Sequence, residues 1–193
     1  MKRYRLATLA LTVLCAATVT AFADKYGERT VSMKIDGTST LHDWTTPVNK
    51  VVARGDLTVA NGELTAVNSM WVQADVLSIK SEKGEDMDEK IYEALKSEDH
   101  PKITYNMTQM KSLKKVGNEW VVETTGDMTI AGTTKKVDMT VKGTVQGNGD
   151  VVFTGSIDLV MTQYGMDRPS AMLGMIKAGD KVKVSFTLTM KKQ

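Results

Sequence analysis

Two histidines, His42 and His100, are the side chains of this sequence best suited to acid–base chemistry. His42 is followed directly by Asp43 and Trp44. An imidazole beside a carboxylate could act as a general base, and both side chains could bind a metal, although two ligands fall short of a stable site. Three interpretations of this tripeptide are open: catalysis or metal binding, contact with a ligand, or a loop in which Trp44 closes one end of the fold. His100 precedes Pro101, which favours a surface position where a strand begins.

Other signatures of enzymes are missing from the sequence. It has no nucleophile elbow, no glycine-rich phosphate loop and no histidine cluster with metal-ligand spacing. Its single cysteine, Cys15, lies in an N-terminal segment that we expect to be removed. We therefore predict a protein with no catalytic residue, no metal and no cofactor, and we keep an enzyme that uses His42 and Asp43 as the alternative.

Residues 1–23 have the three parts of a secretory signal peptide. Lys2, Arg3 and Arg5 form a basic start, residues 6–19 are uncharged and largely apolar, and Ala21-Phe22-Ala23 offers small residues at a cleavage site. A membrane anchor is the alternative, but the apolar run is shorter than the ~20 residues that a spanning helix needs. We expect cleavage after Ala23, a periplasmic or secreted protein, and no transmembrane segment in the mature chain.

The charge of the mature chain is close to balanced. The whole sequence has 25 Lys and Arg against 23 Asp and Glu, and three of the basic residues belong to the signal peptide. Such a chain has no long-range field to attract nucleic acid. Residues 24–193 suit one domain with its own core, and a homodimer formed through hairpin edges stays open.

Most of the mature chain alternates apolar and polar residues with a period of two, which is typical of strands with one buried face. The clearest case is 182–190, and Asn61-Gly62 is typical of a tight hairpin turn. Segment 85–96 has helical spacing instead, because Met87, Ile91 and Leu95 recur every four residues behind an acidic first turn. The other strands are predicted near 30–36, 50–60, 63–79, 102–110, 120–130, 137–145 and 153–162.

About eight strands joined mostly by short turns predict an all-β fold, either a sandwich or a closed antiparallel barrel, with one inserted amphipathic helix. Long strands with one polar and one apolar face favour the barrel. An eight-stranded barrel is filled by its side chains or holds one small ligand, and both interpretations are open.

Methionine is unusually frequent, with 13 residues, and many fall at inward positions of the predicted strands. Its flexible, polarizable side chain fills irregular gaps and adapts to apolar guests. Segment 164–177 breaks the alternation and forms either a mouth with a lid or a short helix that caps the barrel. The predicted ligand-binding residues of lumen and mouth are Trp44, Met70, Tyr105, Met107, Met128, Met139, Phe153, Ile157, Met161, Met172, Met175 and Phe186.

Five segments of the sequence have an order and spacing shared with a known group of proteins. They are Gly37–Trp44, Met87–Tyr92, His100–Tyr105, Gly126–Val137 and Gly179–Val184. On these segments the chain resembles the YceI-like family of exported proteins over about residues 28–191. The resemblance implies an eight-stranded antiparallel lipocalin-like barrel with a helical insertion and a long apolar channel, which holds a polyisoprenoid in some members. It supplies no catalytic residues.

We therefore interpret the sequence as an exported protein that holds an apolar ligand, an isoprenoid or another lipid chain, in its barrel. The alternative is a structural or stress-related interaction protein of the cell envelope, with a filled barrel and no ligand.

Overall fold

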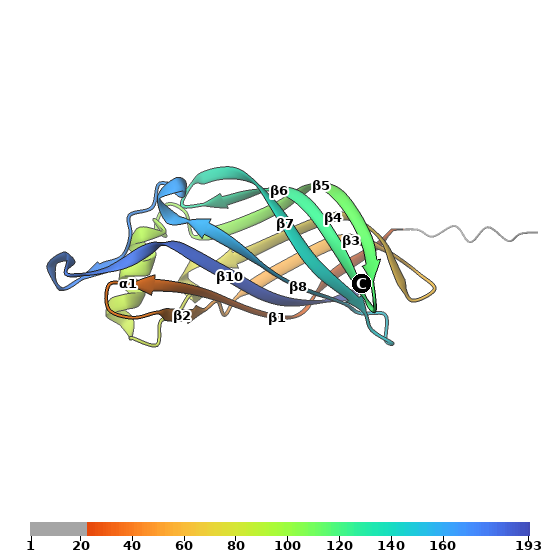
Figure 1. Ribbon diagram of the computed structural model, residues 1–193, viewed down its shortest axis with the longest axis horizontal. Coiled ribbons are helices and arrows are strands. Elements are labelled where there is room, and N and C mark those ends of the chain that lie inside the picture. The colour runs from red at the N-terminus through yellow and green to blue at the C-terminus, as the bar shows by residue number, and fades with distance from the viewer. Residues whose placement is uncertain (1–22) are drawn as a thin grey trace, which may run out of the picture.

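Eight long strands wind around a common axis in the computed structural model, which describes residues 23–193 (Figure 1). Each strand pairs with its neighbours in antiparallel fashion, and the last closes on the first. The predicted fold class, an eight-stranded antiparallel barrel with one inserted helix, is confirmed. The strands are β1 (Asp24–Ser39), β3 (Val51–Ala60), β4 (Glu63–Asp75), β5 (Lys102–Val116), β6 (Glu119–Ile130), β7 (Thr133–Val145), β8 (Val151–Val160) and β10 (Ile176–Lys192).

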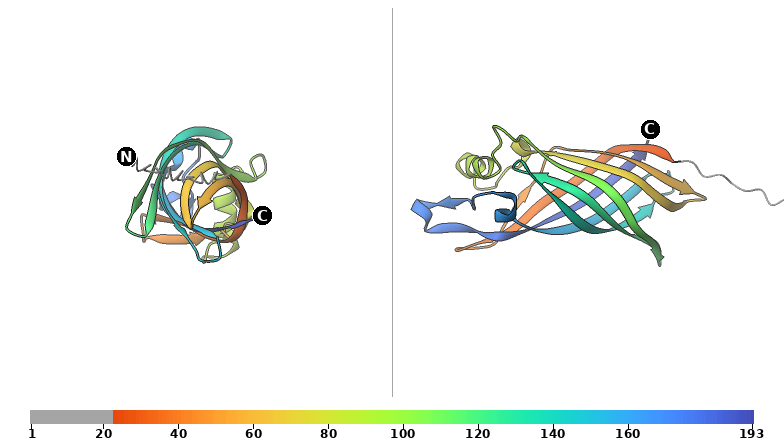
Figure 2. Two further views of the ribbon diagram at one scale, coloured as in Figure 1. Left: turned by 90° about the vertical axis from the view of Figure 1, so that its right-hand side faces the viewer. Right: turned by 90° about the horizontal axis from the view of Figure 1, so that it is seen from above.

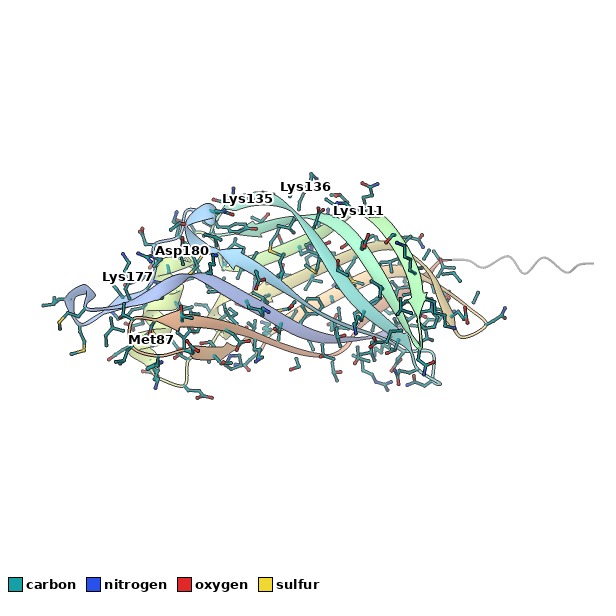
Figure 3. The ribbon with its side chains drawn as sticks, viewed as in Figure 1. Met87, Lys111, Lys135, Lys136, Lys177 and Asp180 are labelled. Atoms are coloured by element: carbon teal, nitrogen blue, oxygen red, sulfur yellow. The ribbon has the colours of Figure 1, made fainter. Side chains whose placement is uncertain are left out.

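The alternation in the sequence becomes an inner and an outer face of the barrel. On β10, Val184 and Phe186 point inward and line the interior, whereas Lys183 belongs to the outer face. Ion pairs on the outer face join strands of the sheet, such as Lys136 of β7 with Asp127 of the neighbouring β6, and Lys111 of β5 with Asp138 of β7, which lies one strand beyond β6 (Figure 3). Exposed pairs of this kind contribute only ~0–1 kcal/mol each, so the apolar inner face is what drives the sheet to close.

The two ends of the barrel differ (Figures 1 and 2). At the end that carries the C-terminus, five buried side chains fill the interior; we call this the packed end. The opposite end carries the helix α1 (Glu85–Ala94) and two short strands, β2 (Trp44–Pro47) and β9 (Ser170–Ala171). Three 3-10 turns lie there too: η1 (Val76–Ser78), η2 (Met161–Tyr164) and η3 (Met172–Gly174). The packed end consists of Leu57, Leu64, Trp120, Val151 and Met190.

Several boundaries differ from the sequence-based expectation. β1 begins at Asp24 rather than near residue 30, because a bulge between Glu28 and Thr30 breaks the alternation there. β5 runs to Val116, whose side chain is exposed where the β5–β6 hairpin extends past the barrel. The helix ends at Ala94 instead of residue 96, and Lys96 has a positive φ of 54°.

The signal peptide predicted at the N-terminus lies largely outside the described residues. Of the signal peptide assigned to residues 1–23, only Ala23 belongs to the described part of the chain, so cleavage and export stay predictions. The helices within residues 23–193 are all too short or too polar to serve as membrane-spanning segments.

The turn between β3 and β4 provides a test of local backbone strain. Asn61 and Gly62 have φ values of 53° and 77°, as the predicted hairpin turn requires. A Cβ on Gly62 would meet nothing within 4 Å, so Gly62→Ala introduces conformational strain alone. We expect it to lower the free energy of unfolding by ~1 kcal/mol, measured by urea denaturation.

The matched control is Gly147→Ala. Gly147 also has open space around its Cβ position but no positive φ. We expect its free energy of unfolding to change by less than ~0.5 kcal/mol. Equal destabilisation by the two variants would contradict the strain at Gly62.

Candidate functional site

A cavity of about 940 Å³ occupies the barrel between the packed end and α1. Inward side chains of the long strands form its wall, and most of them are apolar. The volume falls within the ~300–1,000 Å³ typical of small-molecule pockets. The lumen of this barrel is therefore not filled by its own side chains.

Most of the residues predicted to bind a ligand lie together on this wall. They come from strands far apart in the sequence, which the closure of the sheet brings around one space. Ligand binding by them stays a prediction, but their common location is a feature of the fold. Ten of the twelve line the cavity: Trp44, Met70, Tyr105, Met107, Met128, Met139, Phe153, Ile157, Met161 and Phe186.

Met172 and Met175, which the sequence placed in the segment of the mouth, are not among the residues that line the cavity. Their side chains are 63% and 69% exposed, and Leu173 between them is exposed as well. Ile176 of β10 pairs with Ala171 of β9, so the residues between them form the tip of a hairpin that projects beyond the barrel (Figure 2). The expected lid is thus a projecting hairpin in this structure.

The mouth of the cavity lies at the α1 end, and the sequence left part of it unassigned. Met87 and Ile91 of α1 line the cavity there. Met87 is labelled in Figure 3. Their helical spacing marked them as one apolar face, but periodicity alone does not say what that face covers. From here on, the mouth denotes the residues outside α1 and the long strands that border the cavity at this end: Leu41, His42, Asp43, Ser81, Glu82, Lys83, Pro169 and Ser170.

Trp44 belongs to the wall beside the mouth and does not close the end of the barrel. Its indole N–H donates to the carbonyl oxygen of Thr38 at 2.8 Å. The ring packs on Gly37, where a Cβ would overlap it. A glycine at position 37 thus lets the ring pack closely against β1.

His42 and Asp43 do not form an acid–base pair. Both side chains are exposed, and Nδ1 of His42 lies 2.8 Å from the backbone carbonyl oxygen of Asp43 rather than from its carboxylate. Within residues 23–193 no group of three or more His, Cys, Asp and Glu side chains is arranged to hold a metal ion. The geometry of the tripeptide therefore gives the enzymatic interpretation no support.

A buried carboxylate holds the loop on the α1 side of the mouth. Asp88 accepts the backbone N–H of Ser81 at 2.6 Å, and the ammonium of Lys80 lies 3.0 Å from its other oxygen. Burial alone would raise the pKa of Asp88, but the Ser81 N–H and the Lys80 ammonium together lower it. The hydroxyl of Tyr92 donates to the backbone at η1, which fixes α1 beside the same loop.

The mouth of the cavity carries charged side chains, whereas the polar groups deeper in the barrel are uncharged. The charged side chains on the cavity lining are Asp43, Glu82 and Lys83, and all belong to the mouth. Deeper in the barrel, the hydroxyls of Tyr105 and Thr124 hydrogen bond at 3.0 Å. Burial raises the pKa of Tyr105, so its phenol is uncharged at neutral pH.

A closed eight-stranded antiparallel barrel with an apolar lumen open at one end is a lipocalin-like architecture. The profile of the YceI-like domain matches residues 46–190, which is most of the sequence. The chain therefore belongs to the YceI-like family, as the five segments of the sequence indicate.

Solved structures with the same fold come from several bacteria. BcnA of Burkholderia cenocepacia has a TM-score of 0.62 and 16% identity, over 82% of this chain and 95% of its own. A polyisoprenoid binding domain of Saccharophagus degradans, implicated in plant cell wall breakdown, has a TM-score of 0.65 and 11% identity, over 87% and 98%. The YCEI protein of Campylobacter jejuni has a TM-score of 0.53 and 15% identity, over 100% of both chains. No curated protein matches the sequence.

Replacing Asp88 tests how the mouth is held. Asp88→Ala leaves the Ser81 N–H and Lys80 without their partner, and we expect a loss of ~1–3 kcal/mol in the free energy of unfolding at pH 7. Because the pKa of Asp88 is lowered by folding, its contribution is present above the unfolded pKa of 3.8 and disappears as the pH falls through the lower folded value. Denaturant unfolding from pH 7 down to pH 3 measures both effects.

Asp86→Ala is the control, since Asp86 is an exposed acid in the same first turn of α1. We expect it to change stability by less than ~0.5 kcal/mol. A difference between Asp88→Ala and the wild type that did not shrink in acid would show that the ionised carboxylate is not what holds the loop.

Proposed function

We propose that this protein is an exported binding protein that holds an apolar chain, an isoprenoid or another lipid, in the lumen of its barrel. The observation that carries the proposal is the cavity of about 940 Å³, with apolar walls and one open end. Each buried CH₂ group contributes ~0.8 kcal/mol, so a long chain can bind tightly with few polar contacts. The methionines on the wall can adapt to the shape of such a chain.

Family membership supports the same ligand class. The structure from Saccharophagus degradans is described as a polyisoprenoid binding domain, and this chain shares its fold and belongs to the YceI-like family. Membership of this family and the apolar wall also favour binding over catalysis. The alternative of a filled barrel without a ligand is disfavoured, because it requires side chains where the cavity lies.

Native mass spectrometry of the protein purified from its own source, with solvent extraction of the bound material, tests the proposal directly. We expect an apolar molecule to accompany the protein through purification. Repeated preparations without any such molecule, from protein that also fails to bind a C20 isoprenoid alcohol, would contradict the function.

Filling the lumen should abolish binding. Met128 and Met139 lie on the neighbouring strands β6 and β7, and both line the cavity. We expect Met128→Trp with Met139→Trp to weaken binding of a C20 isoprenoid alcohol at least ~10-fold, because the rings take up space that the chain needs. Fluorescence titration measures the affinity, and circular dichroism checks the fold. If the tryptophans prevent folding, the same positions are replaced by Phe.

The control makes the same replacements outside the cavity. Met172 and Met175 lie on the projecting hairpin, so Met172→Trp with Met175→Trp should leave the affinity within twofold. Equal losses from the inner and the outer pair, or none from either, would argue against the lumen as the binding site.

Export is the part of the proposal that rests on residues 1–23. The basic, apolar and small-residue segments predict removal by a signal peptidase after Ala23. Intact-mass measurement of the protein from a periplasmic or culture fraction should give a chain that begins at Asp24. Recovery of the chain only in the cytoplasm, with its basic N-terminus intact, would refute export.

A further inference from the structure

Two hydroxyl groups lie together on an otherwise apolar part of the cavity wall. The phenol oxygen of Tyr105 is 3.0 Å from Oγ1 of Thr124, and both residues are buried. Thr124 can also donate to the carbonyl oxygen of Met139 at 3.4 Å. When it does so, Tyr105 donates to Thr124, and the phenol oxygen keeps free lone pairs. When Tyr105 turns its proton elsewhere, Thr124 still has a partner.

The sequence around Gly126 places these hydroxyls. Thr124, Gly126 and Met128 share the inner face of β6, since alternate residues of a strand point the same way. Tyr105 pairs with Met128 in register, and its ring extends over Gly126 to reach Thr124. A Cβ at position 126 would overlap the ring and lie 2.7 Å from the carbonyl oxygen of Asn106. The glycine therefore lets the ring lie along the wall, with its hydroxyl directed toward the packed end.

We propose that Tyr105 and Thr124 form a polar subsite inside the lumen for one uncharged oxygen of the ligand, a hydroxyl or a carbonyl, at the inner end of an apolar chain. The proposal rests on the proposed function, because it assumes that the lumen holds such a chain. The pair can donate to a carbonyl oxygen or accept from a hydroxyl group, so it suits either chemistry.

The charged side chains that line the cavity argue against a ligand whose inner end is ionised. Among the described residues that line the cavity, the cationic side chain is Lys83, and it lies at the mouth with Asp43 and Glu82. An unpaired charge costs far more to bury than a hydrogen-bonded hydroxyl. A diphosphate or carboxylate would have to remain at the mouth, beside these two acidic side chains. The lumen therefore selects a chain with a neutral polar end and admits that end first.

Three C20 ligands that share one isoprenoid chain test the subsite: the alcohol, the diphosphate and the parent hydrocarbon. Affinities for the purified protein are measured by quenching of tryptophan fluorescence. We expect the wild type to bind the alcohol more tightly than the hydrocarbon and the diphosphate. Tyr105→Phe and Thr124→Val should each weaken alcohol binding ~3- to 10-fold, the range expected for one hydrogen bond, and change hydrocarbon binding by less than twofold.

Tyr164→Phe tests the competing position for the polar end, and Tyr26→Phe is the matched control. Tyr164 also lines the cavity, nearer the mouth, and its buried hydroxyl is the one buried side-chain polar group without a hydrogen-bond partner among residues 23–193. Tyr26 does not line the cavity, and its hydroxyl donates to the carbonyl oxygen of Gly149 at 3.4 Å. We expect Tyr26→Phe to bind the alcohol as the wild type does. A loss with Tyr164→Phe and none with Tyr105→Phe would place the polar end near the mouth and overturn the proposal.

The remaining outcomes separate the polar subsite from the proposed binding function. If either single variant fails to fold, the double variant Tyr105→Phe with Thr124→Val removes both hydroxyls together, which should be close to neutral for stability. It should still lose affinity for the alcohol and keep that for the hydrocarbon. Equal loss of alcohol and hydrocarbon affinity, or no loss of either, would overturn the subsite while the binding function stands. Binding of none of the three ligands to the wild type would overturn the proposed function and the subsite with it.

Discussion

The pairing of β1 with β10 is the constraint on which the lumen depends. The two strands run antiparallel from Tyr26 opposite Lys192 to Ser39 opposite Ala178, so the first and last parts of the barrel join over almost their whole length. Side chains alternate between the faces of a sheet, and a slip of one residue would turn Met33 and its neighbours to the outside. A single register therefore closes the barrel and sets which side chains face the cavity.

Small residues on the wall explain why the closed barrel is not filled. The ring of Tyr105 lies against Gly126, and the ring of Phe186 lies close enough to Gly155 that a Cβ there would be 2.9 Å from it. Both rings thus extend along the wall instead of across the lumen. At the packed end, Trp120 and the aliphatic side chains around it fill the interior. The same strands therefore enclose both the packed end and the cavity, and the size of the inward side chains decides which of the two forms.

Sequence patterns predicted the strands, the helix and most of the wall, because alternation directly encodes which face is buried. They could not place segments in which apolar residues do not recur at a regular spacing. Met172 and Met175 are the same residue type as the wall methionines, and only the pairing of β9 with β10 carries them away from the cavity. β2 was missed because four residues are too few to show a pattern. The alternation along β6 puts Thr124 on the inner face, but a search for apolar residues passed over it because its side chain is polar.

The open chamber also links ligand binding to the stability of the fold. Side chains around an apolar cavity make fewer dispersion contacts with one another than those of a filled interior, so the β1–β10 ladder and the packed end carry more of the stability of the closed barrel. An apolar chain in the lumen would supply this missing attraction, and a ligand that binds only the folded state stabilises it by mass action. Since the wall is mostly apolar, the stabilisation grows with the length of chain that enters. The hydroxyls of Tyr105 and Thr124 add little to this stabilisation. Their effect is on which end of the chain enters the lumen first.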